Sequence, residues 1–459
     1  MNFKDVRRKL DQVSPSFCIA KWKQVTLYLQ NGQTHSCHHP GTHHVPVSEV
    51  LANPDAIHNS GYKMQRRKEM LEGKRPEECE YCWKIEDLSP DLLSDRLLKS
   101  GDDWALPALD EVRTQPWDYR VKPSYVEVSF SNTCNFKCAY CAPILSSKWA
   151  EELREFGPYA NAPNLDLENL EATKRTPIPE SEPNPYVDAF WKWWPELYPE
   201  LKVFRITGGE PLLTKHTFRV LDYVRANPNP ALDLAVNSNL GAPQKLIDQF
   251  ATSVEALIVG KKVKSFQLYT SIDTWGEQAE YIRTGMDFES FWSRIRELLI
   301  RIPKMKIGLM CTVNVMSVPR LHQLLEGVGK LKAEFRDPDS GEPRVTIDFP
   351  YLMDPEFLSA KILPPEFAAH FKKFLDFIAA HRGIEAFSTS ELQKMERLVT
   401  WFAKPVDEAW LRKQRAIFFQ FISSYDQRRN LSFARTFPEL KQFFDICRLE
   451  FAAAAASGT

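Results

Sequence analysis

The chain has 459 residues, of which 43% are hydrophobic, so it is long enough for roughly two to four structural units with a sizeable core. Its 59 Lys and Arg residues balance its 60 Asp and Glu residues, which argues against a strongly basic nucleic-acid-binding surface. No stretch approaches the roughly 20 apolar residues that span a bilayer, and the start MNFKDVRRKLDQVS lacks the apolar run of a secretory signal. We therefore expect a cytoplasmic protein with neither membrane nor nucleic acid as a partner.

The first part of the chain, residues 1–120, is rich in cysteine, histidine and charge. The segment WKQVTLYLQNGQTHSC predicts two short strands around an Asn31-Gly32 turn. The segment QRRKEMLEGKRPEECEYCW predicts a short helix that runs into a CxxC turn. We therefore expect a small α+β domain over residues 1–120.

From 121 to 360, patterns typical of strands alternate with amphipathic helical patterns. The predicted strands lie at 124–130, 202–208, 232–238, 265–272, 306–313 and 344–352. Strand–helix alternation predicts right-handed βαβ units and a parallel sheet, which is an α/β fold. Six repeats are too few for a closed eight-stranded barrel, so we expect a partial (β/α)6 TIM-like barrel with its chemistry at the C-terminal strand ends.

Three further segments flank or interrupt this pattern. Residues 142–186 are polar and end Pro-rich, and they could form a lid because they directly follow a group of three cysteines. The next segment, DAFWKWWPEL, predicts a helix that packs its tryptophans against the barrel rather than a stacking platform for substrate. Residues 361–450 predict a helical region, and the tail 451–459 is expected to be disordered.

The three cysteines lie in SNTCNFKCAYC, just after the first predicted barrel strand, at Cys134, Cys138 and Cys141. In a reducing compartment, metal or cluster ligation is a more probable use of cysteine than disulfides. Thiolates are the natural ligands of iron–sulfur clusters, and three of them can hold three irons of a [4Fe-4S] cube. The fourth iron would then be open to a substrate or cofactor. Zinc would instead take four protein ligands, or three with a water.

Polar motifs follow the next strands in order. The second strand ends in Gly208, Gly209, Glu210 and Pro211, the third in Asn237 and Ser238, and the fourth leads into SIDTWGEQAEYIRTG with Ser271, Asp273 and Arg283. Glycines allow the backbone to approach a ligand closely, and a carboxylate is a suitable partner for an ammonium group. Each motif alone is a weak signal, but their order on successive strand ends is specific.

Together these motifs resemble the radical S-adenosylmethionine (radical SAM) superfamily over about 122–352. The resemblance implies a [4Fe-4S] cluster on Cys134, Cys138 and Cys141 whose open iron binds S-adenosylmethionine (AdoMet). One electron, from an external donor such as flavodoxin or ferredoxin, then cleaves AdoMet, and the 5'-deoxyadenosyl radical abstracts a substrate hydrogen. The family pattern puts Tyr140 near adenine and the GGEP motif of residues 208–211 at the methionyl amino group. It puts Asn237 and Ser238 among the polar residues at the third strand end. Ser271 and Asp273 would contact the ribose, and Arg283 would pair with the methionyl carboxylate.

Four further cysteines, Cys18, Cys37, Cys79 and Cys82, precede the barrel. Their layout resembles the twitch and SPASM auxiliary-cluster domains of radical SAM enzymes, which implies an auxiliary [4Fe-4S] cluster that assists electron transfer. Structural zinc and unligated cysteines remain alternatives, since four thiolates also saturate one zinc ion. The stretch CHHPGTHH is interpreted as a polar loop beside the cluster. Cys311 is interpreted as a buried small side chain, although a thiol that returns a hydrogen atom remains open.

The substrate is the least determined feature. Twitch and SPASM relatives often modify peptides or protein side chains, so the resemblance implies a peptide or amino-acid-like substrate. The same chemistry on a sugar, nucleotide or other small metabolite is the alternative, and epimerisation, cross-linking and oxidation are all open outcomes. A more remote alternative is a zinc-ribbon binding protein with structural cysteines, which predicts a basic surface that the charge balance does not favour.

Overall fold

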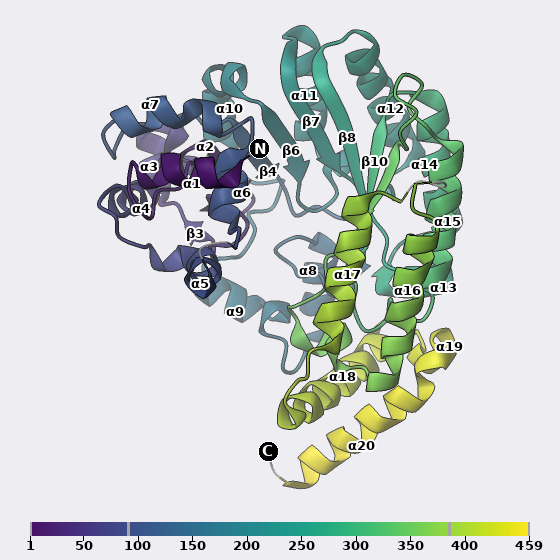
Figure 1. The fold of residues 1–459 in the computed structure, drawn as a ribbon. Helices are drawn as coiled ribbons and strands as arrows, with labels where there is room; N and C mark the ends of the chain where they lie inside the picture. The colour runs from purple at the N-terminus through teal and green to yellow at the C-terminus, as the bar shows by residue number, and fades with distance from the viewer. Residues whose placement is uncertain (1, 90–91, 384–386, 458–459) are drawn as a thin grey trace. The chain divides into compact units, whose positions relative to one another are not determined.

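The computed structural model describes residues 2–89, 92–383 and 387–457, and the chain divides into two compact units. The N-terminal unit comprises Met1–Asn132, Thr173–Val236 and Val259–Ser265, and the C-terminal unit comprises Thr133–Ala172, Asn237–Ile258 and Phe266–Thr459. This division differs from the predicted boundaries, because residues 1–120 share a unit with the first barrel strands. Figure 1 shows the order of the elements along the chain.

All six predicted barrel strands are present, as β4 (Tyr125–Ser129), β6 (Val203–Thr207), β7 (Asn229–Asn237), β8 (Val263–Ser271), β10 (Lys306–Met310) and β11 (Val345–Asp348). In the N-terminal unit β4, β6 and β7 pair in parallel in this order. In the C-terminal unit β10 pairs in parallel with both β8 and β11. The predicted α/β class with a parallel sheet is therefore confirmed, whereas closure into a partial barrel stays a prediction.

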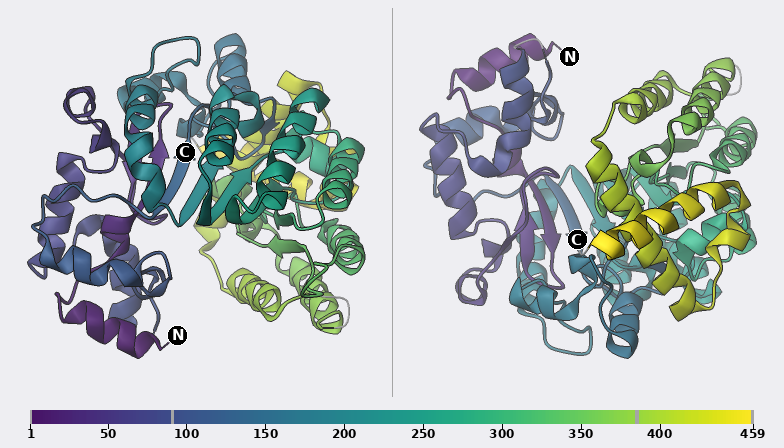
Figure 2. Two further views of the ribbon diagram at one scale, coloured as in Figure 1. Left: turned by 90° about the horizontal axis from the view of Figure 1, so that it is seen from above. Right: turned by 90° about the horizontal axis from the view of Figure 1, so that it is seen from below.

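The predicted hairpin is also present. Strand β1 (Gln24–Tyr28) pairs antiparallel with β2 (Gln33–His35), which pairs with the short β3 (His43–His44). Strand β1 in addition pairs in parallel with β4, in the register Thr26 to Glu127. Figure 2 shows the purple hairpin beside the blue strand β4. The hairpin therefore extends the parallel sheet instead of forming a separate domain.

The N-terminal unit also contains nine α-helices among the residues that the structure describes. They are α1 (Phe3–Asp11), α2 (Ala20–Lys23), α3 (Val47–Ala52), α4 (Gly61–Leu71), α5 (Glu80–Leu88), α6 (Asp95–Gly101), α7 (Leu109–Thr114), α10 (Pro185–Leu197) and α11 (Lys215–Ala226). Trp193 and Trp194 of α10 are buried, and the Trp194 ring lies 4.9 Å from that of Phe204 on β6. The packing interpretation of these two tryptophans is therefore confirmed.

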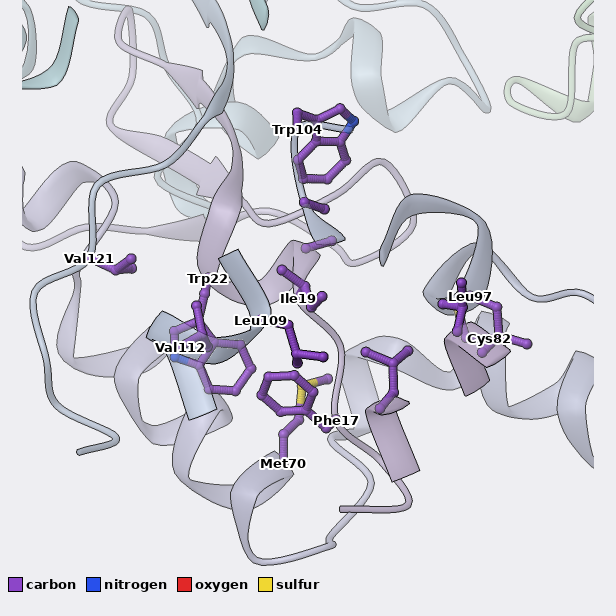
Figure 3. Packing of buried hydrophobic residues seen from close by; sticks show 14 of the residues in the cluster. Phe17, Ile19, Trp22, Met70, Cys82, Leu97, Trp104, Leu109, Val112 and Val121 are labelled. Atoms are coloured by element: carbon purple, nitrogen blue, oxygen red, sulfur yellow. The ribbon is translucent and has the colours of Figure 1, made fainter. Parts of the chain in front are cut away.

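A cluster of buried hydrophobic side chains packs beneath the cysteine-rich part of the N-terminal unit. Figure 3 shows Phe17, Trp22 and Met70 among its members. Cys82 belongs to the cluster, and Cys18 and Cys79 pack against it. Three of the four N-terminal cysteines are therefore anchored on a packed core.

The C-terminal unit contains the short strands β5 (Lys137–Cys138) and β9 (Arg283–Thr284) besides β8, β10 and β11. Its helices are α8 (Ser147–Phe156), α9 (Leu167–Ala172), α12 (Gln244–Val259), α13 (Glu277–Ile282), α14 (Phe288–Arg301), α15 (Leu321–Glu334), α16 (Ala368–Ala380), α17 (Thr389–Ala403), α18 (Glu408–Arg429), α19 (Phe433–Thr436) and α20 (Lys441–Ser457). Helices α18 and α20 lie side by side (Figure 1), with the rings of Phe418 and Phe443 5.5 Å apart.

The C-terminal end corrects one expectation. Residues 451–457, predicted to be disordered, continue α20 as far as Ser457. The run of alanines explains the difference, because alanine has the highest intrinsic helix propensity and simply extends the preceding amphipathic turns. Residues 458–459 of the predicted tail lie outside the described residues.

Candidate functional site

The loop with the three cysteines is held against a second segment of the C-terminal unit. Strands β5 and β9 pair antiparallel, which sets Cys138 opposite Arg283. The Trp149 indole donates a hydrogen bond of 2.9 Å to the carbonyl of Cys138, and the Cys134 amide donates one of 3.2 Å to Ser147 Oγ. The predicted lid segment thus begins with α8, whose first turn fixes the cysteine loop.

The three thiols form one group. Burial is the main cause of the raised pKa of Cys141, and the neighbouring thiols of Cys138 and Cys134 raise it further. Burial also raises the pKa of Cys138, which the Arg283 guanidinium opposes. A bound metal cation would lower these thiol pKa values, since coordinating thiols are deprotonated. The three thiols are therefore close enough on one loop to influence one another's pKa.

Behind the thiols lies a buried polar network built from predicted site residues. The fully buried Asp273 carboxylate accepts hydrogen bonds from Tyr140 (3.0 Å) and the Thr312 amide (3.1 Å), and it lies 2.9 Å from Arg283 Nε. Arg283 Nη1 donates to Cys138 Sγ over 3.6 Å. Burial raises the pKa of Asp273, although Arg283 opposes this shift. Asp273 is therefore a partner of Arg283 and Tyr140, and the ribose contact that the resemblance implies stays a prediction.

The ends of β7, β8 and β10 contain four further residues that the sequence analysis named. Ser238 is buried and its Oγ accepts the Leu240 amide at 3.0 Å, and Asn237 is the last residue of β7. Ser271 ends β8, opposite Met310 of β10. Cys311 is completely buried, and its thiol donates to the Asp273 carbonyl over 3.4 Å. This burial agrees with the interpretation of Cys311 as a packed side chain.

Two residues that the sequence did not single out contact the cysteine loop. Asn239 Nδ2 lies 3.8 Å from Cys134 Sγ and donates to Asn135 Oδ1 at 3.0 Å. Arg429, at the end of α18, donates to the Lys137 carbonyl at 2.8 Å and forms a buried ion pair of 2.9 Å with Glu152. A single Asn in a polar loop, or a single Arg in a distant helix, carries no sequence signal of such a role.

The GGEP motif lies in the N-terminal unit, directly after β6. Gly208 has φ +110°, and a Cβ there would lie 2.3 Å from Ser129 Oγ, so this position requires glycine. The Gly209 amide donates to the Ser131 carbonyl at 3.2 Å. Glu210 is buried, and its Oε1 accepts the Leu212 amide at 2.9 Å in the short turn that begins with Pro211. The motif therefore forms a tight turn directly after β6, at the strand end where the sequence placed it.

The four N-terminal cysteines converge. Cys18, Cys37, Cys79 and Cys82 all line one cavity of the N-terminal unit. Burial raises the pKa of Cys79 and of Cys82 to about 12, and other cysteines of the four add to both shifts. Within the ranges that the structure describes, no three His, Cys, Asp or Glu side chains are arranged to hold a single metal ion.

Basic side chains share this cavity with the thiols. Lys21, Arg96, Lys99 and His39 all line it. Lys21 is ion-paired with Glu78, and the imidazole of His39 lies 2.7 Å from the Asp95 carboxylate. Of the four histidines in CHHPGTHH, only His39 is among the described residues that line this cavity. The cavity therefore combines four thiols with basic side chains and the carboxylate of Asp95.

Comparisons with known proteins add a distant structural likeness. No family model matches the chain, and no curated protein matches it either. A solved structure described as "Native anSMEcpe with bound AdoMet" is similar, with a TM-score of 0.33 and 18% sequence identity, over 55% of this chain. The matched region spans 58% of that structure's chain, which is less than two thirds of its length. This likeness is too distant to assign a function.

No helix in the described part of the chain is long and apolar enough to cross a membrane.

Proposed function

We propose that the chain is a radical SAM enzyme. The observation that carries this proposal is the loop of three grouped thiols, at Cys134, Cys138 and Cys141, backed by Arg283. These thiols would hold three irons of a [4Fe-4S] cluster, because soft thiolates suit iron–sulfur clusters and the loop supplies no fourth cysteine. When bound, such a cluster supplies the electron that cleaves AdoMet to a 5'-deoxyadenosyl radical, for hydrogen abstraction from the substrate.

The other predicted site residues would contribute to AdoMet binding. The tight turn of Gly208, Gly209, Glu210 and Pro211 would receive the methionyl amino group, with Asn237, Ser238, Ser271 and Tyr140 near the nucleoside. Arg283 would pair with the methionyl carboxylate, a task suited to its planar fork of donors. Asp273 would act through Arg283 and Tyr140, since its carboxylate already accepts hydrogen bonds from Tyr140 and contacts Arg283.

We further propose an auxiliary [4Fe-4S] cluster on Cys18, Cys37, Cys79 and Cys82. The convergence of all four thiols on one cavity supports it, and the cationic lining suits a cluster whose four thiolates carry net negative charge. With four protein ligands this cluster would transfer electrons and leave no iron open to substrate. We propose a peptide or amino-acid-like molecule as the substrate. An external donor of the flavodoxin or ferredoxin type would supply the electron. The proposed compartment is the cytoplasm.

Iron analysis after anaerobic purification and reconstitution tests both cluster assignments. The wild-type chain should bind about eight irons. A variant with Cys134, Cys138 and Cys141 changed to Ala and a variant with Cys18, Cys37, Cys79 and Cys82 changed to Ala should each retain about four. The control Cys447→Ala, at a buried cysteine of α20, should retain the wild-type content. Zinc without iron in the wild-type chain would overturn the proposal and favour the zinc-ribbon alternative.

A further inference from the structure

A hydrogen-bond network in the C-terminal unit joins the start of the cysteine loop to the loop that follows β7. The second loop turns at Asn239, whose Oδ1 accepts the amide of Gly241 at 2.7 Å. From the cysteine loop, the side chain of Asn135 donates to the Gly241 carbonyl at 2.9 Å. This close approach requires glycine, because a Cβ at position 241 would lie 2.4 Å from the Phe136 ring. The two loops therefore support each other directly beside the first of the three thiols.

The same network determines which way the Asn239 carboxamide faces. A backbone N–H can only donate, so the carboxamide atom that faces the Gly241 amide must be the oxygen. The nitrogen therefore faces the cysteine loop, where Nδ2 donates to Asn135 Oδ1 at 3.0 Å and lies 3.8 Å from Cys134 Sγ. A carboxamide has two N–H groups, which is one for each of these acceptors. The contact of Asn239 with the sulfur thus follows from the rest of the network.

Cys134 Sγ meets two N–H donors in this arrangement. The Phe136 amide donates to it over 3.4 Å, and Asn239 Nδ2 over 3.8 Å. Hydrogen bonds to the ligating sulfurs are among the factors that set the reduction potential of an iron–sulfur cluster. An N–H that points at sulfur raises this potential, because reduction adds negative charge, which the positive end of the N–H stabilises. The backbone donor does not depend on the residue type at position 136, whereas the donor of Asn239 is specific to its side chain.

We propose that Asn239 is a positioning residue for the cluster on the cysteine loop, which orients the Cys134 sulfur and raises the reduction potential of that cluster through its N–H. This inference rests on the proposed function and deepens it, since it names the residue that regulates how readily the cluster accepts an electron from the external donor. A residue that only shaped the loop would affect retention of the cluster and leave its potential unchanged.

An EPR-monitored redox titration of the reconstituted full-length protein, without AdoMet, tests the proposal. The signal of the loop cluster is the one that is absent when Cys134, Cys138 and Cys141 are changed to Ala. Asn239→Ser removes the N–H donor and keeps an oxygen for the Gly241 amide, because Ser supports the same kind of turn. The potential of this variant should be more negative than that of the wild type, while the iron content stays at about eight.

A second variant and a control separate the hydrogen bond from the shape of the loop. Asn239→Asp retains the size of the side chain and the acceptor for the turn, but it lacks the N–H and adds a negative charge. Its potential should therefore be more negative still. Gln244→Ala, which removes an exposed carboxamide at the start of α12, should keep the wild-type potential.

The two Asn239 variants decide the outcome together. The proposal is overturned if both keep the wild-type potential. It is also overturned if both lose the iron of the loop cluster, because that loss would indicate a purely structural role. A wild-type protein without any EPR signal that depends on the three loop cysteines would instead refute the proposed function itself.

Discussion

At the residue scale, Asp273 links three parts of the candidate site. Its carboxylate accepts a hydrogen bond from Tyr140 and contacts Arg283, while the Arg283 guanidinium also reaches Cys138. A buried carboxylate beside a buried guanidinium fixes the orientation of both, because either charge alone would be strongly unfavourable there. The arginine proposed for AdoMet is therefore held in place before any ligand arrives.

His58 gives the N-terminal unit a pH dependence. It is fully buried, bonded to the Trp22 carbonyl and to Lys63, and burial holds its pKa well below the ordinary 6.5. Below pH 6.5 the unfolded chain therefore binds a proton that the folded chain does not. The free energy of unfolding should fall with decreasing pH, by up to about 1.4 kcal/mol per pH unit from this group.

Chemical denaturation between about pH 7.5 and about pH 5 measures this slope. His58→Gln should reduce this slope by the share of one proton, because His38 and His43, whose pKa values burial also lowers, keep their own shares. The exposed His322→Gln should leave the slope unchanged. An unchanged slope in His58→Gln would show that His58 is not the titrating group.

Lys21 should raise the reduction potential of the proposed auxiliary cluster. Its side chain is 2% exposed and lines the cavity of the four thiols. Reduction adds negative charge, which a nearby buried cation stabilises. Lys21→Met should therefore shift the potential to a more negative value in an EPR-monitored redox titration. Lys84→Met, whose lysine is 70% exposed on the neighbouring α5, is the matched control and should show no comparable shift. Equal potentials in all three proteins would refute this role of Lys21.

At the element scale, helix α18 supports the cysteine loop from the C-terminal region. Arg429 at its end contacts the Lys137 carbonyl and Thr284, which are neighbours of Cys138 and Arg283 in the paired strands β5 and β9. Arg429 also pairs with Glu152 of α8, and their side chains are only 2% and 1% exposed. One buried guanidinium therefore ties α18 and α8 to both strands of the ribbon.

A double-mutant cycle tests this link. Arg429→Met alone should lower the free energy of unfolding by about 2 kcal/mol, because the buried Glu152 carboxylate loses one charged partner and keeps only Lys137 and Tyr159. Combination with Glu152→Gln should recover part of that loss, so that the coupling energy is about 1 kcal/mol or more. The exposed pair Arg296 and Glu334 provides the control cycle, with an expected coupling below about 1 kcal/mol. A coupling for Arg429 and Glu152 no larger than in the control would contradict the assignment.

At the scale of the whole molecule, the sequence pattern predicts the strands far better than their long-range partners. Alternation of strand and helix located all six barrel strands, and Asn31-Gly32 located the hairpin. Neither pattern contains the information that β1 would join β4, because parallel pairing depends on contacts between residues about a hundred positions apart.

For the candidate site too, the sequence predicts local features better than long-range contacts. The sequence pattern placed Cys134, Cys138 and Cys141 together on one loop and Gly208 at the end of a strand. It could not predict Arg429, since an arginine on an amphipathic helix normally faces solvent and only the tertiary fold buries it. The convergence of Cys18 and Cys37 with the CxxC pair likewise depends on the packing of separate elements around one cavity.

Formation of 5'-deoxyadenosine tests the central claim most directly. The reconstituted wild-type chain, incubated anaerobically with AdoMet and dithionite, should release this product even without substrate. The variant with Cys134, Cys138 and Cys141 changed to Ala should release none, whereas the variant with Cys79 and Cys82 changed to Ala should still cleave AdoMet. Product formation at the wild-type rate after loss of the three loop cysteines would contradict the account.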